Sequence, residues 1–168
     1  MIPVGLIQPQ IFPDDRGHFQ EMVNMSKEPF SSELFIQQNV SYNKKYVFRG
    51  MHYQYKNPQA KLVTVLKGSV TDFIVDLREW SPNFGKVQSY QLSEKNRLSL
   101  WVPQCFAHGF LCLEDDTIFS YNVFDNPRVV GDEYSINPFS LGMEFGEFTI
   151  MSDKDRNGMS FKDAPKYE

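Results

Sequence analysis

The run KLVTVLKGSVTDFIVDL, residues 61–77, decides the fold class of this chain. Two stretches rich in β-branched residues, 61–66 and 69–77, are separated by the dipeptide Lys67-Gly68. Branched side chains favour strands, and a two-residue link that ends in glycine is typical of a tight turn. The pattern predicts two strands joined as a β-hairpin.

Alternation along the second strand assigns its two faces. Val70, Asp72, Ile74 and Asp76 share one face, because successive side chains of a strand point to opposite sides. That face carries two carboxylates. Alternation alone therefore predicts that it is the solvated face.

The rest of the chain repeats this β pattern. Further strands are expected at residues 35–40, 85–92, 98–102, 109–113 and 117–123, with polar turn segments between them. The chain has only three alanines against 15 phenylalanines and 8 tyrosines, which favours sheet over helix. We expect an antiparallel sandwich or barrel, with helix only around residues 26–34 and in a C-terminal turn.

Length, charge and cysteine content exclude several classes of protein. No linker or repeat interrupts the 168 residues, so one domain spanning residues 1–168 is expected. A formal charge of −4 without a basic block argues against nucleic acid and anionic membranes as partners. No apolar run is long enough to span a membrane, and the first residues do not resemble a signal peptide. Two cysteines, Cys105 and Cys112, are too few for a disulfide scaffold, so a cytoplasmic protein is expected.

The three histidines are His18, His52 and His108. A metal site in a β-barrel typically uses two histidines at alternate positions of one strand, with a carboxylate a few residues further on. Here Gln54 follows His52 and Phe110 follows His108, so the sequence has no His-x-His pair. We expect no metal and no other cofactor, which leaves the histidines for acid–base chemistry.

His52 is the best candidate for a general base, because neutral imidazole is available near neutral pH. Arg49, three residues earlier, could hold an anionic substrate. Lys61 could stabilise an oxyanion at the rim of a barrel, and Tyr121 could deliver a proton. Each of these residues also has an ordinary structural interpretation, and Asp155 by itself suggests a charged surface turn. Residue types alone leave the functional class open.

Six ordered motifs resemble the nucleotide-sugar 3,5-epimerases, the family typified by dTDP-4-dehydrorhamnose 3,5-epimerase. The motifs are DDRGHFQE (14–21), FIQQN (35–39), RGMHYQ (49–54), KLV (61–63), LWVPQCFAHGF (100–110), and SDKD (152–155) followed by DAP (163–165). The resemblance runs from about residue 5 to residue 165, and six motifs in this order are a far more specific signal than an isolated Arg-Gly-x-His.

The resemblance implies an all-β fold, a metal-free cupin-like jelly-roll barrel with a few short helices. It also implies an enzyme that inverts C3 and C5 of a nucleotide-linked 4-keto-6-deoxy sugar through enol intermediates, in the biosynthesis of cell-surface polysaccharide sugars. His52 would be the base, oriented by Asp155, and Tyr121 the acid. Lys61 would stabilise the enolate oxygen.

The resemblance further implies a homodimer in which the N-terminal segment of one subunit completes the active site of the other. Substrate-binding roles carry over to Arg49, His108, Gln37, Asn39, Glu133 and Lys154 in one subunit, and to Arg16, Phe19 and Glu21 from the partner subunit. The matching position of Asp72 faces into the barrel in the family, which is opposite to the prediction from alternation.

Three departures from the family pattern lie where the base and sugar are recognised. Residues 121–128 lack a pair of tyrosines, residues 137–139 replace a Trp-Asn-Asp, and His18 stands where an aromatic residue is common. The nucleotide (dTDP, GDP or another) and the sugar (hexose or heptose) therefore stay open.

Three alternatives remain from the sequence. The chain could be an epimerase that inverts only C3 or only C5. It could be a related jelly-roll ketoisomerase, which moves the carbonyl between C4 and C3. It could also be a sugar-binding jelly roll without catalytic activity.

Overall fold

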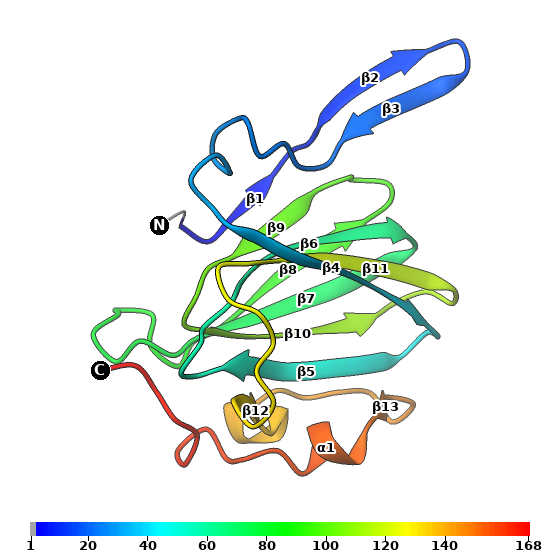
Figure 1. Cartoon of the computed structure of the whole chain (residues 1–168). Helices are drawn as coiled ribbons and strands as arrows, with labels where there is room; N and C mark the ends of the chain where they lie inside the picture. Colours follow the sequence, from blue (N-terminus) through cyan, green and yellow to red (C-terminus); the bar gives the residue numbers. More distant parts are fainter. Residues whose placement is uncertain (1–2) are drawn as a thin grey trace.

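The computed structural model describes residues 3–168 and contains two large sheets that face each other (Figure 1). The first sheet consists, in spatial order, of β1 (Gly5–Ile7), β9 (Ser99–Val102), β6 (Ala60–Lys67), β11 (Thr117–Phe124) and β4 (Phe35–Asn43). The second consists of β12 (Glu133–Ser135), β5 (Val47–Gln54), β10 (Phe106–Cys112), β7 (Ser69–Asp76) and β8 (Val87–Ser93). Most neighbouring strands are not consecutive in the chain, as in a jelly roll.

The remaining elements lie outside these two sheets or at their margin. A separate hairpin extends away from the sandwich, and a two-residue strand pairs in parallel with β5 (Figure 1). These elements are β2 (Gln10–Asp14), β3 (Gly17–Glu21), the 3-10 helix η1 (Pro138–Leu141), β13 (Ile150–Met151) and α1 (Asp153–Arg156). The predicted all-β jelly roll with few short helices is confirmed. No helix in residues 3–168 is long and apolar enough to cross a membrane.

The predicted hairpin of β6 and β7 is wrong, because the two strands belong to different sheets. β6 pairs with β9 and β11, whereas β7 pairs with β10 and β8. Tight two-residue hairpins need a left-handed first turn residue, yet of Lys67 and Gly68 only Gly68 has a positive φ (79°). The link therefore directs the chain from one sheet into the other.

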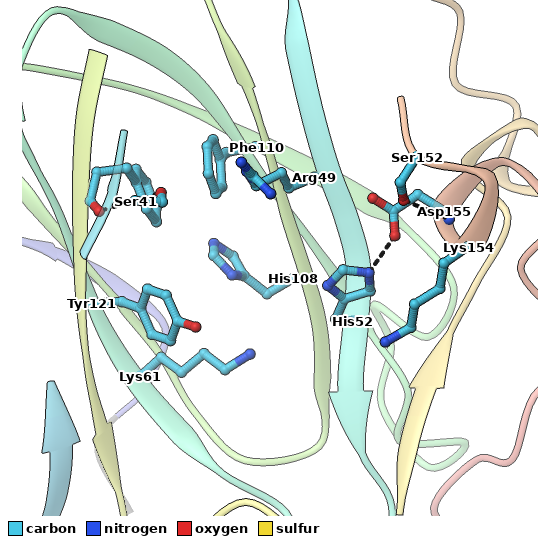
Figure 2. Close-up of a pocket in the computed structure, with 11 residues that line it drawn as sticks. Ser41, Arg49, His52, Lys61, His108, Phe110, Tyr121, Ser152, Lys154 and Asp155 are labelled. Carbon is cyan, nitrogen blue, oxygen red and sulfur yellow. Dashed lines mark hydrogen bonds and ion pairs between the residues drawn. The ribbon is translucent and has the colours of Figure 1, made fainter. Parts of the chain in front are cut away.

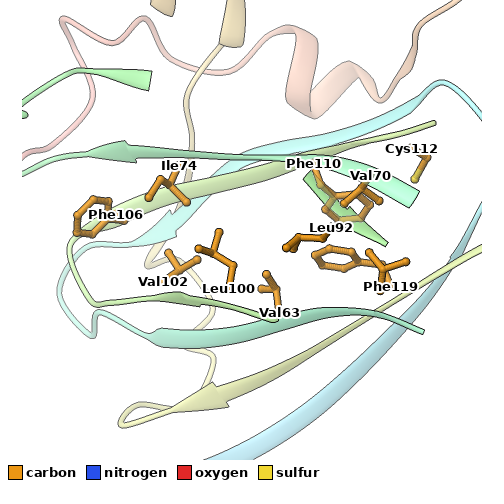
Figure 3. Close-up of a cluster of buried hydrophobic side chains, with 11 residues drawn as sticks. Val63, Val70, Ile74, Leu92, Leu100, Val102, Phe106, Phe110, Cys112 and Phe119 are labelled. Atoms are coloured by element: carbon orange, nitrogen blue, oxygen red, sulfur yellow. The ribbon is translucent and has the colours of Figure 1, made fainter. Parts of the chain in front are cut away.

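The apolar core fills the space between the sheets (Figure 3). Val63 of the first sheet and Val70, Ile74 and Phe110 of the second belong to it, each 5 % exposed or less. Asp72 lies on the same face of β7 and is fully buried. The prediction of a solvated face for β7 is therefore wrong, because the opposite sheet packs over this face.

The expected helix at residues 26–34 does not form. Backbone hydrogen bonds there span three residues, as from Phe30 N–H to the Lys27 oxygen and from Glu33 N–H to the Phe30 oxygen (both 3.0 Å). Pro29 has no N–H to donate and disfavours helical geometry in the residue before it. The segment instead buries Phe30 against Trp101 and Phe124, on the outer side of the first sheet.

Candidate active site

A cavity of about 370 Å³ opens between the two sheets (Figure 2). Its walls combine cationic, aromatic and hydroxyl groups with one carboxylate. The lining residues are Ser41, Arg49, His52, Lys61, His108, Phe110, Phe119, Tyr121, Ser152, Lys154 and Asp155. Seven residues predicted from the sequence therefore meet in one place: Arg49, His52, Lys61, His108, Tyr121, Lys154 and Asp155.

A bulge at Gly50 directs both Arg49 and His52 into this cavity. Residues three apart on a regular strand point to opposite faces. In the pairing of β5 with β10, however, His52 lies opposite His108 and Arg49 opposite Phe110, so β5 carries one extra residue. Gly50 has a φ of 145°, and a Cβ there would lie 2.5 Å from the Cα of Gly109. Only glycine fits this contact.

His52 forms a close pair with Asp155, with 2.5 Å between Nε2 and Oδ1. Strand β13 pairs with the start of β5 and leads directly into α1, which places Asp155 beside the histidine. The Ser152 side chain caps α1 by accepting from the Asp155 N–H (3.2 Å). Asp155 is only 4 % exposed, so its interpretation as a surface turn is wrong.

The groups that contact Asp155 favour the ionised form of its carboxyl group. Burial acts to raise the pKa of this carboxyl, but the hydrogen bond and charge of His52, together with Ser152 and the Gly50 N–H, outweigh burial and lower it. A carboxylate only accepts hydrogen bonds, so His52 donates through Nε2. In the neutral form of the ring, this donation leaves the lone pair on the second nitrogen, Nδ1, as a general base requires.

Tyr121 and Lys61 form the opposite wall, on β11 and β6 of the first sheet (Figure 2). Burial is the main cause of a raised pKa at Tyr121, so the phenol keeps its proton well into the alkaline range. Burial also lowers the pKa of Lys61 to about 8, against the opposing influence of Asp72 and Glu133. The cavity thus places a potential base on one side and a proton donor and a cation on the other.

His108 is held by the buried carboxylate of Asp72. Its Nε2 lies 3.0 and 2.9 Å from the two oxygens of Asp72, and both residues are buried. Burial raises the pKa of Asp72, opposed by His108 and Lys61. The inward position of Asp72, implied by the family resemblance, serves to orient a ring that lines the cavity.

Six residues predicted to bind substrate do not line the cavity. Asn39 lies opposite Tyr121 in the pairing of β4 with β11, and Gln37 donates to Asn39 Oδ1 (2.6 Å). Glu133 lies beside the cavity, with its Oε2 3.9 Å from Nζ of Lys154, which lines the cavity. Arg16, Phe19 and Glu21 lie on the β2–β3 hairpin, where Arg16 pairs with Asp14 (2.6 Å) and Phe19 is 67 % exposed.

Four lining residues were missed from the sequence: Ser41, Phe110, Phe119 and Ser152. Two simple signals could have found three of them. Ser41 continues the alternation of Gln37 and Asn39 on β4, and Phe119 stands two residues before Tyr121 on β11. Phe110 stands two residues after His108 on β10.

No group of three or more His, Cys, Asp or Glu side chains within residues 3–168 is placed to hold a metal ion. A jelly roll that opposes a His–Asp pair to a tyrosine and a half-buried lysine across one cavity is suited to proton transfer at carbon. The fold and site thus define a class of jelly-roll proteins whose cavity is equipped for acid–base chemistry.

Comparison with known proteins identifies the family within this class. Residues 3–163 match the family model described as dTDP-4-dehydrorhamnose 3,5-epimerase. The crystal structure of the enzyme of that name from Sulfolobus tokodaii superposes with a TM-score of 0.89 at 37 % identity, covering 98 % of this chain and 94 % of that chain. The chain belongs to the dTDP-4-dehydrorhamnose 3,5-epimerase family, whose members are isomerases of cupin-like jelly-roll fold.

Two further relatives extend this comparison. The 3,5-epimerase of Legionella pneumophila, solved in complex with dTDP-4-keto-L-rhamnose, has a TM-score of 0.90 at 34 % identity and covers 98 % of this chain and 94 % of that chain. A dTDP-4-dehydrorhamnose 3,5-epimerase of Neisseria gonorrhoeae is 39 % identical over 97 % of this chain. The chain spans about half (51 %) of the length of that relative.

Proposed function

We propose that this chain inverts C3 and C5 of a dTDP-linked 4-keto-6-deoxy hexose. The observation that carries the proposal is the position of the His52–Asp155 pair across one cavity from Tyr121 and Lys61. Family membership and the dTDP-4-keto-L-rhamnose bound to the Legionella relative support the substrate class. GDP-linked and heptose substrates are the alternatives that the departures in the sequence leave open.

The first half of each inversion is removal of a proton next to the C4 ketone. Nδ1 of His52 takes the proton from C3 or C5, and the C–H electron pair moves into the ring to form an enolate with its charge on the C4 oxygen. Asp155 accepts from Nε2 and stabilises the imidazolium that forms. An α-proton is far less acidic than imidazolium, so the ammonium of Lys61 is needed to stabilise the enolate oxygen.

The second half returns a proton to the opposite face. Tyr121 delivers its phenolic proton to the same carbon, which inverts the centre and restores the ketone. His52 then releases its proton and Tyr121 regains one, with exchange from water, before the second centre reacts. Substrate contacts are assigned to Arg49, His108, Gln37, Asn39, Glu133 and Lys154.

The chain acts, in this proposal, as a cytoplasmic homodimer without cofactor. The β2–β3 hairpin extends from the sandwich, with Phe12 and Phe19 44 % and 67 % exposed (Figure 1). Arg16, Phe19 and Glu21 on this hairpin are then supplied to the nucleotide site of the partner subunit. This arrangement gives the exposed aromatic residues a function.

Proton–deuterium exchange followed by NMR tests the reaction. The enzyme is incubated in D₂O with dTDP- and GDP-linked 4-keto-6-deoxy sugars, and deuterium is expected at both C3 and C5 of the dTDP-linked sugar. Deuterium at one carbon identifies a single-centre epimerase, and a shifted carbonyl identifies a ketoisomerase. Tight binding of the nucleotide sugar without any exchange would indicate a binding protein without catalytic activity.

Mixed dimers test the contribution of the hairpin. Arg16→Ala and His52→Asn variants are each expected to be inactive or nearly so. When subunits of both variants are mixed and exchanged, one site per heterodimer would combine an intact His52 with an intact Arg16, and activity should return. Mass spectrometry verifies that heterodimers have formed. If activity does not return in them, the shared site is contradicted.

A further inference from the structure

The buried side chain of Asn43, at the end of β4, holds two groups that line the cavity although it does not line the cavity itself. It is 5 % exposed. Its Oδ1 accepts from Nε of Arg49 (2.9 Å), and its Nδ2 donates to Oγ of Ser41 (3.0 Å). Nδ2 also contacts the backbone oxygens of Ser41 and Thr117, at 3.1 and 3.3 Å. Asn43 therefore connects β4 of one sheet to an arginine of the other.

The contact with Nε fixes the orientation of the guanidinium. Nε lies in the guanidinium plane, so holding it restricts the plane and the direction of the two Nη groups. Among the described residues, these Nη groups of Arg49 make no hydrogen bond or ion pair. Arg49 is exposed and would otherwise sample many rotamers, which costs entropy when a ligand orders it.

We propose that Asn43 is a positioning residue, which directs the Nη groups of Arg49 toward the anionic diphosphate of the nucleotide sugar. The inference rests on the proposed function. A planar fork of donors with a fixed direction suits phosphate oxygens. Asn43 thereby lowers the ordering cost of binding without touching the substrate.

Two substitutions separate positioning from structure. Asn43→Ala removes both polar groups and is expected to raise KM for the sugar, and Kd for dTDP in calorimetry, roughly tenfold with little change in kcat. Asn43→Asp keeps an acceptor for Nε but loses the Nδ2 donors, so it is expected to lower the melting temperature while KM stays within about twofold of wild type.

A double-mutant cycle isolates the contact. In an Arg49→Ala background, Asn43→Ala should cause no further rise in KM or Kd, because the group it positions is gone. The matched control is Asn96→Ala, in the turn before β9, which loses hydrogen bonds with Gln91, Ser93 and Leu98 (2.8, 3.0 and 3.1 Å). It should affect stability only.

The outcomes distinguish this inference from the proposed function. If the wild type exchanges protons but Asn43→Ala binds dTDP normally, the inference alone is wrong. An equal rise in KM with and without Arg49 would also overturn it. If the wild type neither binds dTDP nor exchanges protons, the proposed function fails and this inference fails with it.

Discussion

The imidazole of His52 and the carboxylate of Asp155 lie 2.5 Å apart although the two residues are 103 positions apart in the sequence. The structure brings them together through the pairing of β13 with β5 and the single turn of α1. Asp155 is almost fully buried, while His52 remains accessible from the cavity. This arrangement fixes which nitrogen of the ring carries the proton.

Asp155→Asn is expected to lower kcat by about a hundredfold or more. The amide that replaces the carboxylate can donate to Nε2, which favours the tautomer with a proton on Nδ1 and removes the base. Steady-state kinetics with circular dichroism would measure the effect. Asp153→Asn, an exposed carboxylate in the same helix, should retain wild-type turnover. Wild-type turnover of a folded Asp155→Asn variant would exclude the role of the pair.

Tyr121→Phe is expected to separate proton removal from inversion. His52 still removes the proton, but no acid is present on the opposite face. Deuterium should therefore enter the recovered substrate, while inverted product falls by roughly a hundredfold or more. NMR of the sugar in D₂O measures both. His52→Asn should abolish exchange as well as inversion, and equal loss of exchange in the two variants would argue against separate roles.

The alkaline limit of activity is expected to follow Lys61. Because burial lowers the pKa of Lys61 to about 8, kcat/KM should fall as the pH rises above that value and the ammonium loses its charge. Lys61→Met is expected to lower kcat by about a hundredfold at pH 7. Its profile should lack the decline near pH 8. An unchanged decline in this variant would assign the titration to another group.

Stability provides an independent test of the same lysine. Its folded pKa lies below the ordinary value of 10.5, so the charged form disfavours folding. The resulting loss of folding free energy is fully present below pH 8. It disappears as the pH rises from about 8 to 10.5, because in this range the unfolded chain binds more protons at Lys61 than the folded protein does. Urea unfolding should show Lys61→Met more stable than wild type at pH 7, with the difference shrinking toward pH 10.5.

Gly50→Ala is expected to destabilise the protein by about 3 kcal/mol or more, and to displace Arg49 or His52. The new Cβ would meet backbone atoms of His108 and Gly109, which cannot rotate away. Urea denaturation measures the loss. Gly17→Ala is the matched control: its φ of 131° is similar, but nothing lies within 4 Å, so a cost of about 1 kcal/mol is expected. If Gly50→Ala and Gly17→Ala lowered the free energy of unfolding equally, the close approach of Gly50 to Gly109 would contribute little.

The sequence by itself determined the local features of this protein. Strands β6, β7 and β11 follow from alternating and β-branched residues, because strand periodicity is a property of neighbouring residues. The family resemblance also marked His52, Lys61, Tyr121 and Asp155, all of which line the cavity. Strand β5 escaped prediction because the bulge at Gly50 interrupts its alternation.

Without the family resemblance, the residues left open which faces are buried and which side chains meet, and the tertiary structure decided both. Periodicity divides β7 into two faces but does not say which one is covered, and the buried face proved to be the one with Asp72 and Asp76. The separation of β6 from β7 and the meeting of His52 with Asp155 depend on strand pairing between distant segments. Such pairing is selected by the total burial and hydrogen bonding of the whole sandwich, which no short stretch of sequence contains.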